Sequence, residues 1–420
     1  MTLSEVRPAP AAAPPAPVAP PSLVPLLALA SGVAVANNYY LQPLLALIGK
    51  DLGVGSAQVG LVSAVALFGY ALGLLLVVPL GDIVDRRLLV TTVLSGTALS
   101  LVVMALAPSV LVLGAAAFGV GLTSVVAQVL VPYAASIADD ASRGRVVGFV
   151  LSGILVGILS ARVVAGLAGA ALGWRAVYAG AAGLTLALLL LLLIGLPAEP
   201  QRHRRHGRPD IPYSQVLAGV GRLVRSNGQL RVRAFYGACG FAVFSSTWTA
   251  LAFHLHDQFG IGSTGVALVA LLGIGGAVLS PRAGRLADRG RSTVVTGAAY
   301  AALLVGTGLL ALGSTSLPLL IAGLVVTDLA IQGGHVTNMG IVYRLVPEAR
   351  SRATTVFMTT LFLGGAVGSV FSALAYSAGG WPAVSAGCAV FAGTALVTWL
   401  VRLPVRAPRM LDEPFPEAVA

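Results

Sequence analysis

Long runs of apolar residues, almost free of charge, repeat along this chain from near its start to near its end. A helical run of about 20 residues, rising about 1.5 Å per residue, crosses the hydrocarbon core of a bilayer. Only 10% of the 420 residues are charged, against about 25% in an ordinary soluble protein. The pattern therefore predicts an all-α membrane protein and not a set of soluble domains.

Twelve such segments can be counted, and we expect each to be a transmembrane helix. A basic loop separates the first six from the last six. The expected spans are residues 22–46, 56–79, 88–107, 109–135, 146–170, 175–196, 233–255, 263–282, 293–313, 317–343, 352–377 and 381–402.

The basic residues predict the orientation, because lysine and arginine gather in cytoplasmic loops. With both termini and the even-numbered loops in the cytoplasm, only Lys50 and Arg175 of the 26 basic residues fall outside, and Arg162 falls within a span. The expected regions are a disordered Ala/Pro-rich cytoplasmic tail (1–21), an N-terminal six-helix bundle (22–196), a basic cytoplasmic linker (197–232), a C-terminal six-helix bundle (233–403) and a cytoplasmic tail (404–420).

The two groups of six helices resemble each other. The stretch "GDIVDRR" at Gly81 returns as "GRLADRGR" at Gly284 (284 − 81 = 203). The stretch "GWRAV" at Gly173 returns as "GWPAV" at Gly380 (380 − 173 = 207). Two parallel six-helix repeats are typical of secondary transporters, whose substrate site lies between the repeats.

Through these spans, this repeat and the Gly-x-x-x-Asp-Arg loop in each half, residues 22–403 resemble the major facilitator superfamily. More narrowly, "YYLQPLL" (Tyr39–Leu45) and "GDIVDRR" resemble bacterial predicted arabinose-efflux and drug-exporter-like permeases. The resemblance implies a monomeric, multi-pass transporter of the bacterial inner membrane that works by alternating access. Ala115 departs from the pattern, since proton-coupled drug exporters carry an arginine there, and the fifth span lacks their Gly-Pro pair.

The two Gly-x-x-x-Asp-Arg loops are the first candidate functional feature. Their glycines let helix ends approach closely, and Asp85 and Asp288 can each cap a helix N-terminus. In the superfamily such loops act as a latch that holds one alternating-access state; the alternative is that they only fix the topology. The latch candidates are Gly81, Asp82, Asp85, Arg86, Arg87, Gly284, Arg285, Asp288, Arg289 and Arg291.

Asp328 is the only acidic residue inside any expected span, and it lies near mid-membrane. An aspartate at the centre of a membrane helix costs about 2.5–3.5 kcal/mol, which a partner, water or a proton must offset. Gln332 and His335 share its helix face. We expect Asp328 to couple transport to protons with His335 as a relay; cation recognition or a structural hydrogen bond is the alternative.

Polar residues cluster at one depth on the first and fourth helices of each half, which line the central cavity in the superfamily. The offset of 207 places His335 over Gln128, and residues 37–42 over residues 244–249. Polar contacts between helices are the alternative explanation. The expected cavity residues are Asn37, Asn38, Tyr39, Tyr40, Gln42, Gln128, Ser245, Thr247, Trp248, Gln332, Asn338 and Arg162.

Arg162 is the only basic residue deep in a span. It could pair with Asp328, bind an anionic substrate, or extend outward to the membrane surface. Small residues near it, and others in the eleventh span, predict close packing between the two halves. They are Gly153, Gly157, Ala161 and Ala165, and Gly364, Gly365 and Gly368.

The sequence holds no ATP-binding loop, no hydrolase motif and no Cys/His cluster, so we expect no catalytic residue, cofactor or metal. The predicted function is proton-coupled export of a small amphipathic molecule. Uptake or facilitated transport of a sugar or an organic anion, with Arg162 as the anion site, is the alternative, and a non-transporting membrane sensor is a remote one. The expected partners are a small-molecule substrate, protons and the lipid bilayer, with no nucleic acid.

Overall fold

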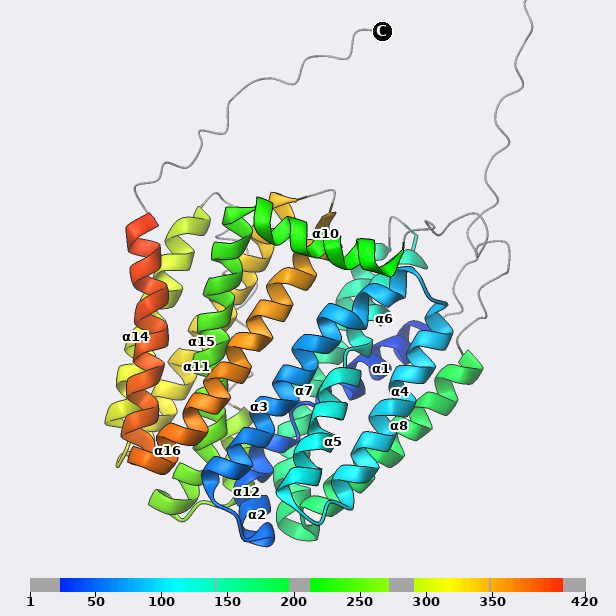
Figure 1. The fold of residues 1–420 in the computed structure, drawn as a ribbon. Coiled ribbons are helices and arrows are strands. Elements are labelled where there is room, and N and C mark those ends of the chain that lie inside the picture. Colours follow the sequence, from blue (N-terminus) through cyan, green and yellow to red (C-terminus); the bar gives the residue numbers. More distant parts are fainter. Residues whose placement is uncertain (1–22, 140–141, 196–211, 272–290, 347–348, 403–420) are drawn as a thin grey trace, which may run out of the picture.

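The computed structural model describes residues 23–139, 142–195, 212–271, 291–346 and 349–402. These residues are almost entirely helical, and no strand occurs among them. Figure 1 shows two helical bundles side by side, with α10 (Tyr213–Ser226) lying across one end of both. We call this end the α10 face. The expected tails and residues 197–211 of the expected linker lie outside the described residues.

Each bundle comes from one half of the chain. The first is built from α1 (Leu23–Ala36), α2 (Leu41–Leu52), α3 (Ser56–Leu76), η1 (Val78–Asp82), α4 (Arg86–Ala105), α5 (Val110–Thr123), α6 (Val126–Ser136), α7 (Arg143–Leu172) and α8 (Trp174–Gly195). The second is built from α11 (Gly228–Phe259), α12 (Ser263–Ala270), α14 (Ser292–Leu312), α15 (Leu317–Leu345) and α16 (Arg350–Arg402).

Ten stretches of the described residues are long and apolar enough to cross a membrane. One of them, α16, has 53 residues and leaves helical geometry at Gly379 and Gly380, so it contains the last two expected spans. Helix α12 begins the expected span 263–282, of which residues 272–282 lie outside the described residues. The predicted all-α membrane fold is confirmed.

Two expected spans are interrupted near their middle. The first, predicted as one helix over residues 22–46, breaks between Ala36 and Leu41, so that α1 and α2 are separate. Pro43 explains this break, because proline lacks an N–H and its ring clashes with the carbonyl group four residues earlier. The fourth span is interrupted between Thr123 and Val126. In membrane transporters, broken helices of this kind lie at the substrate site.

The small-residue stripes lie within the bundles and not between them. A Cβ added to Gly157 would lie 2.3 Å from the carbonyl oxygen of Gly32 on α1. One added to Gly368 would lie 2.3 Å from the carbonyl oxygen of Ala242 on α11. The predicted packing between halves is therefore wrong for these stripes, because each one lets two backbones of the same bundle approach closely.

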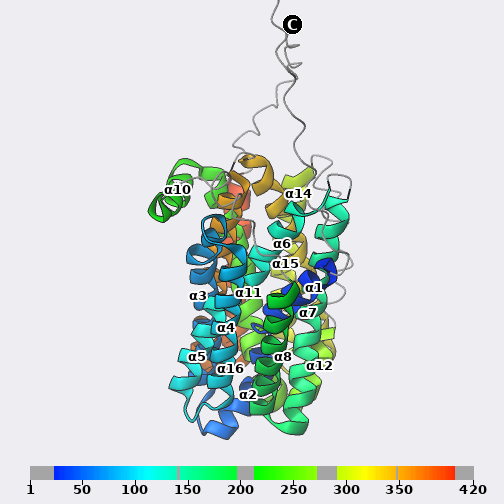
Figure 2. The same cartoon turned by 90° about the vertical axis from the view of Figure 1, so that its right-hand side faces the viewer.

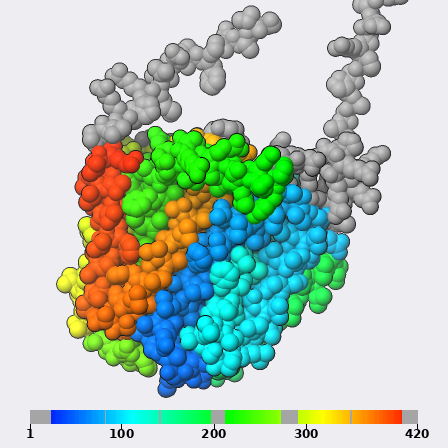
Figure 3. Space-filling view, in the orientation of Figure 1, coloured from blue at the N-terminus to red at the C-terminus, as the bar shows by residue number. Residues whose placement is uncertain are grey.

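The bundles meet at the face opposite α10, where α2 contacts α11 and α12, and α7 contacts α12. A Cβ added to Gly166 of α7 would lie 2.5 Å from the carbonyl oxygen of Ser263. Along another boundary α3 and α16 run side by side, and the space-filling view shows them in contact (Figure 3). The ring centroids of Tyr70 and Phe362 lie 4.3 Å apart there.

Helix α10 connects the bundles at its own face. The hydroxyl of Tyr213 donates a hydrogen bond to the carbonyl oxygen of Leu76, 2.6 Å away in the first bundle. Val220, on the other hand, packs in an apolar cluster with side chains of both bundles, including Leu74 and Phe357. Figure 2 shows that α10 also projects sideways beyond the helices beneath it. Its apolar side therefore faces the protein, while Arg222 and Arg225 are exposed.

Candidate functional site

Three aromatic rings surround Arg162 of α7 at the boundary between the bundles. Its guanidinium carbon lies 4.1 Å from the ring centroid of Trp248, 5.0 Å from that of Tyr39 and 5.1 Å from that of Phe244. Tyr39 belongs to the break between α1 and α2, whereas the other two rings belong to α11. Arg162 is only 3% exposed. It therefore does not extend to the membrane surface, and that alternative is wrong.

Asp328 of α15 lies within electrostatic range of Arg162, and the indole of Trp248 lies next to its carboxylate. No contact ion pair joins Arg162 to Asp328, although both residues are described. The base comes from the first bundle and the acid from the second. The attraction between Arg162 and Asp328 therefore acts across the boundary between the bundles and without direct contact.

Asp328, Gln332 and His335 lie on one face of α15, as their spacing predicts, and each is half-buried. The ring centroid of His335 lies 5.7 Å from that of Phe357 on α16. Thr327, in contrast, is 1% exposed and packs against α14. The face of α15 that carries Asp328, Gln332 and His335 is therefore not the face that packs against α14 in the second bundle.

Several buried polar atoms near Arg162 have no hydrogen-bond partner among the described residues. They are Nε and Nη2 of Arg162, both side-chain amide atoms of Asn37 and of Asn38, and Oε1 of Gln42. Each such atom costs about 1–3 kcal/mol. A cluster of them is expected where a bound molecule completes the hydrogen bonds, so this cluster supports a binding site at the break between α1 and α2.

The other expected cavity residues differ in exposure. Asn38, Tyr39, Gln128 and Gln332 are half-buried, whereas Asn37, Tyr40, Gln42 and Ser245 are buried. Two cavities of this structure lie at the α10 face instead, and none of these residues lines either of them. The central cavity therefore stays a prediction.

Thr247 and Asn338 have polar contacts inside the second bundle. The hydroxyl of Thr247 lies 3.9 Å from the sulfur of Cys388 on α16. Asn338 is fully buried, accepts a hydrogen bond from Arg233 (3.2 Å) and donates one to the hydroxyl of Tyr300 (3.4 Å). These contacts fit the helix-to-helix alternative, and a place for the two side chains in the cavity stays a prediction.

Sequence reasoning missed two residues, Phe244 beside Arg162 and Arg233 at the start of α11. Phe244 lies four residues before Trp248 and so shares its helix face, which was the available signal. Arg233, the first residue of the seventh expected span, lies inside the second bundle and also donates to Thr296 at 3.1 Å. Nothing in its sequence context separates it from the exposed arginines before it.

The first Gly-x-x-x-Asp-Arg loop holds helices of the first bundle together. Asp85 caps α4 as predicted, by accepting a hydrogen bond from the backbone N–H of Leu88 at 3.0 Å. Arg86 donates to Ser136 of α6 at 3.3 Å, and Arg87 donates to a backbone carbonyl of α8. These bonds fix three helix ends at the α10 face.

The remaining latch candidates are only partly described. Gly81 is buried, but a Cβ there would meet Val129 at 3.5 Å, an ordinary contact, so the predicted close approach is wrong at this glycine. Arg291 is exposed before α14. Outside the described residues lie the side chain of Asp82 and all of Gly284, Arg285, Asp288 and Arg289. The latch role stays a prediction.

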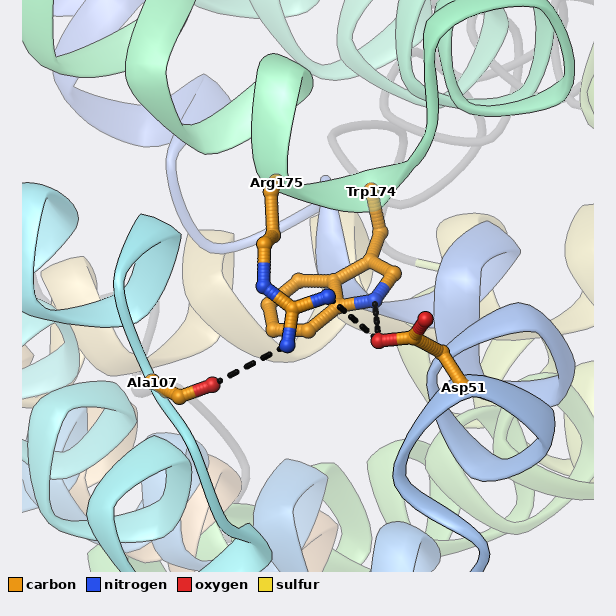
Figure 4. Close-up of polar contacts among 4 residues, drawn as sticks. All are labelled: Asp51, Ala107, Trp174 and Arg175. Atoms are coloured by element: carbon orange, nitrogen blue, oxygen red, sulfur yellow. Dashed lines mark hydrogen bonds and ion pairs between the residues drawn. The ribbon is translucent and has the colours of Figure 1, made fainter.

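Asp51, Trp174 and Arg175 form a corner of the first bundle at the face opposite α10 (Figure 4). The indole N–H of Trp174 donates to Oδ2 of Asp51 at 3.1 Å, and Arg175 forms an ion pair with the same oxygen. Arg175 also donates to the carbonyl oxygen of Ala107 at 3.3 Å. The corner thus joins the end of α2, the turn after α4 and the start of α8, and explains the position of Arg175.

The sequence model of the Major Facilitator Superfamily matches residues 27–317 and 237–418. The uncharacterized transporter YgaY of Escherichia coli O157:H7 is 40% identical over 382 residues, which cover 90% of this chain and 95% of that protein.

Solved structures have the same fold. The nucleoside transporter NupG has a TM-score of 0.74 at 15% identity, over 91% of this chain and 100% of that one. The human organic anion transporter MFSD10 has a TM-score of 0.65 at 16% identity, over 90% of this chain and 100% of that one.

These comparisons cover both bundles and the connection between them. The narrower resemblance to efflux permeases stays a prediction, because at 15% and 16% identity the solved structures show the fold alone. With the all-α fold, the family match and a relative named as a transporter, the chain belongs to the Major Facilitator Superfamily and is a multi-pass membrane transporter.

Proposed function

We propose that this transporter exports a small amphipathic molecule in exchange for protons, with Asp328 as the coupling acid. The observation that carries the proposal is a half-buried carboxylate at the boundary between the bundles, without a contact ion pair among the described residues. As the bundles rock against each other, the distance from Asp328 to Arg162 changes. The proton affinity of the carboxylate then depends on the conformational state, which is what coupling requires.

His335 is the proposed proton relay, because it shares the half-buried face of α15 with Asp328. The aromatic rings of Tyr39, Phe244 and Trp248 form the apolar part of the proposed substrate site. The unpartnered amides of Asn37 and Asn38 supply hydrogen bonds. An apolar wall with a few polar groups is typical of small-molecule sites and favours an amphipathic substrate.

The α10 face is the proposed cytoplasmic side of a bacterial inner membrane, with both termini on that side. Exposed arginines gather there, including Arg143, Arg222 and Arg352, which favours this orientation under the positive-inside rule. The contacts of α2 and α7 with α11 and α12 then lie on the outer side, as expected for a state closed to the outside. In this proposal the Gly-x-x-x-Asp-Arg loops act as the latch of the opposite state.

Growth of an efflux-deficient bacterial host on a panel of toxic compounds tests this function. We expect the wild type to confer resistance to at least one compound and Asp328→Asn to abolish it. Asp257→Asn is the matched control, because Asp257 lies near the outer end of α11, where it accepts a hydrogen bond from Tyr376 at 2.8 Å. Resistance that survives in Asp328→Asn contradicts the coupling role, and no resistance from the wild type contradicts export.

A second candidate function is transport of an organic anion, with Arg162 as the binding residue. The unpartnered Nε and Nη2 atoms of this 3%-exposed arginine favour it, since a carboxylate would satisfy both. Uptake of labelled organic acids into cells tests it. We expect Arg162→Gln to abolish such uptake and Asp328→Asn to leave exchange in place; uptake that survives in Arg162→Gln contradicts this candidate.

A further inference from the structure

A cavity of about 260 Å³ opens at the α10 face, between the start of α11 and the end of α16. Its lining residues are Gly228, Arg231, Val232, Phe235, Thr398 and Arg402. No acidic residue is among them, and neither arginine forms an ion pair with a described acid. Two guanidinium groups in one cavity give it a positive potential, so this cavity attracts an anion.

Both arginines have N–H groups to spare. Arg231 donates through Nη1 to the carbonyl oxygen of Arg225 at 3.3 Å, which holds its side chain in place without neutralising it. Arg402 is exposed at the end of α16. A guanidinium group presents paired N–H donors that match a phosphate group. A carboxylate matches the same donors, so the cavity favours an oxyanion, phosphate or carboxylate, over a halide.

The same helix ends present a large apolar surface next to the cavity. Phe235 is 38% exposed, and on the last turns of α16 Val397, Leu400 and Val401 are 57%, 50% and 68% exposed. In a chain that spans a bilayer, exposed apolar side chains on such helices meet lipid acyl chains. A ligand with an anionic head and apolar tails matches both the cavity and this surface.

A second cavity at the same face has the charge without the apolar surface. It has a volume of about 220 Å³ and is lined by Gly219, Arg222, Leu223, Ser226, Ala349 and Arg352. Its one large apolar side chain, Leu223, packs against the cluster beneath α10. This cavity can attract an anion but offers no surface for acyl chains, so it is the natural comparison for the first.

We propose that the Arg231–Arg402 cavity binds the phosphate headgroup of an anionic phospholipid from the cytoplasmic leaflet. Anionic lipids of that leaflet attract basic side chains near the membrane surface. The site relies on the α10 face being cytoplasmic, as proposed above, but it is independent of what the protein transports. It lies where α11, which supplies Phe244 and Trp248, enters the membrane, so a bound lipid holds that helix end against α16.

Lipid binding to the purified full-length protein tests this site. Native mass spectrometry measures the Kd for phosphatidylglycerol, with zwitterionic phosphatidylethanolamine as the reference lipid. We expect the wild type to prefer phosphatidylglycerol, and Arg231→Gln with Arg402→Gln to bind it about thirtyfold more weakly, since each basic residue near an anionic surface contributes about fivefold. Arg222→Gln with Arg352→Gln removes the same charge from the second cavity and is expected to keep wild-type affinity.

Three results would overturn the proposal. One is wild-type affinity for phosphatidylglycerol in the Arg231/Arg402 variant, and another is an equal loss in the Arg222/Arg352 variant. The third is inorganic phosphate binding to the wild type as tightly as phosphatidylglycerol, which would assign the cavity to a soluble anion. If the double variant does not fold, Arg402→Gln at the exposed helix end is measured in its place. We expect it to bind phosphatidylglycerol about fivefold more weakly than the wild type. Unchanged binding would contradict the site.

Discussion

Gly173 and Gly380 occupy the same place in the two bundles, 207 residues apart, and both have a positive φ, 84° and 62°. Each is followed by a tryptophan that is 2% exposed and whose indole N–H donates a hydrogen bond. Trp174 donates to the carboxylate of Asp51 at 3.1 Å, and Trp381 donates to the carbonyl oxygen of Leu310 at 2.7 Å. The two bundles therefore repeat the same backbone corner with different acceptors.

At the centre the two bundles differ. The residue 207 positions after Arg162 is Ser369, which shares a hydrogen bond with Thr249 at 3.0 Å inside its own bundle. The residue 207 positions before Asp328 is Gly121, where a Cβ would lie 2.0 Å from the carbonyl oxygen of Ala66. The scaffold is repeated but the charges are not. The first bundle supplies Arg162 and the second supplies Asp328. The attraction between these two charges therefore acts across the boundary between the bundles.

Replacing Arg162 by lysine tests that difference with the largest expected effect. Lysine keeps the charge but loses the planar group that lies over Trp248. A desolvated cation–π contact is worth about 2 kcal/mol, so we expect the kcat/KM of transport to fall about thirtyfold. Ser369→Ala at the equivalent position should leave the rate of transport unchanged. If both substitutions slow transport equally, the centre is not asymmetric in the way described.

Replacing the corner tryptophans by phenylalanine compares the repeated feature directly. Trp381→Phe leaves the carbonyl oxygen of Leu310 without its donor and removes an indole that stacks on His254, 4.5 Å between ring centroids. We expect it to lower the free energy of unfolding by about 1–3 kcal/mol. Trp174→Phe should cost less, about 1 kcal/mol, because Asp51 keeps its bond to Arg175. Thermal unfolding of the purified proteins measures both, and a larger loss for Trp174→Phe would reverse the comparison.

Asp51→Asn is expected to have the smallest effect. Its ion pair with Arg175 is exposed, with 44% accessibility for each side chain. Exposed pairs contribute about 0–1 kcal/mol and weaken as salt is added. Unfolding curves at low and high salt should therefore differ between the wild type and Asp51→Asn only at low salt. If Asp51→Asn still lowers the free energy of unfolding at high salt, the contribution of Asp51 is more than that of an exposed ion pair.

Sequence patterns predicted what depends on one helix at a time. The shared face of Asp328, Gln332 and His335 follows from helical spacing, and the cap at Asp85 follows from helix-terminus chemistry. The Gly-Trp pair that repeats at Gly173 and Gly380 also marks equivalent positions in the two bundles. Each of these features is encoded within a few consecutive residues.

The patterns do not specify which helix lies next to which. Thr247 and Asn338 are polar and at the expected depth, but their side chains contact neighbours inside the second bundle. Gly157 has the expected small-residue spacing but packs within its bundle. The rings around Arg162 come from two segments far apart in sequence. No spacing rule specifies such contacts, because they arise from the packing of whole bundles.

The measurement that tests the central claim most directly is transport into inside-out membrane vesicles under an imposed pH gradient, acidic inside. It uses a compound to which the wild type confers resistance. We expect the wild type to accumulate the compound against its gradient. Asp328→Asn should exchange the compound across the membrane at a measurable rate but should not accumulate it. Accumulation by Asp328→Asn at the wild-type level would contradict the assignment of Asp328 as the coupling acid.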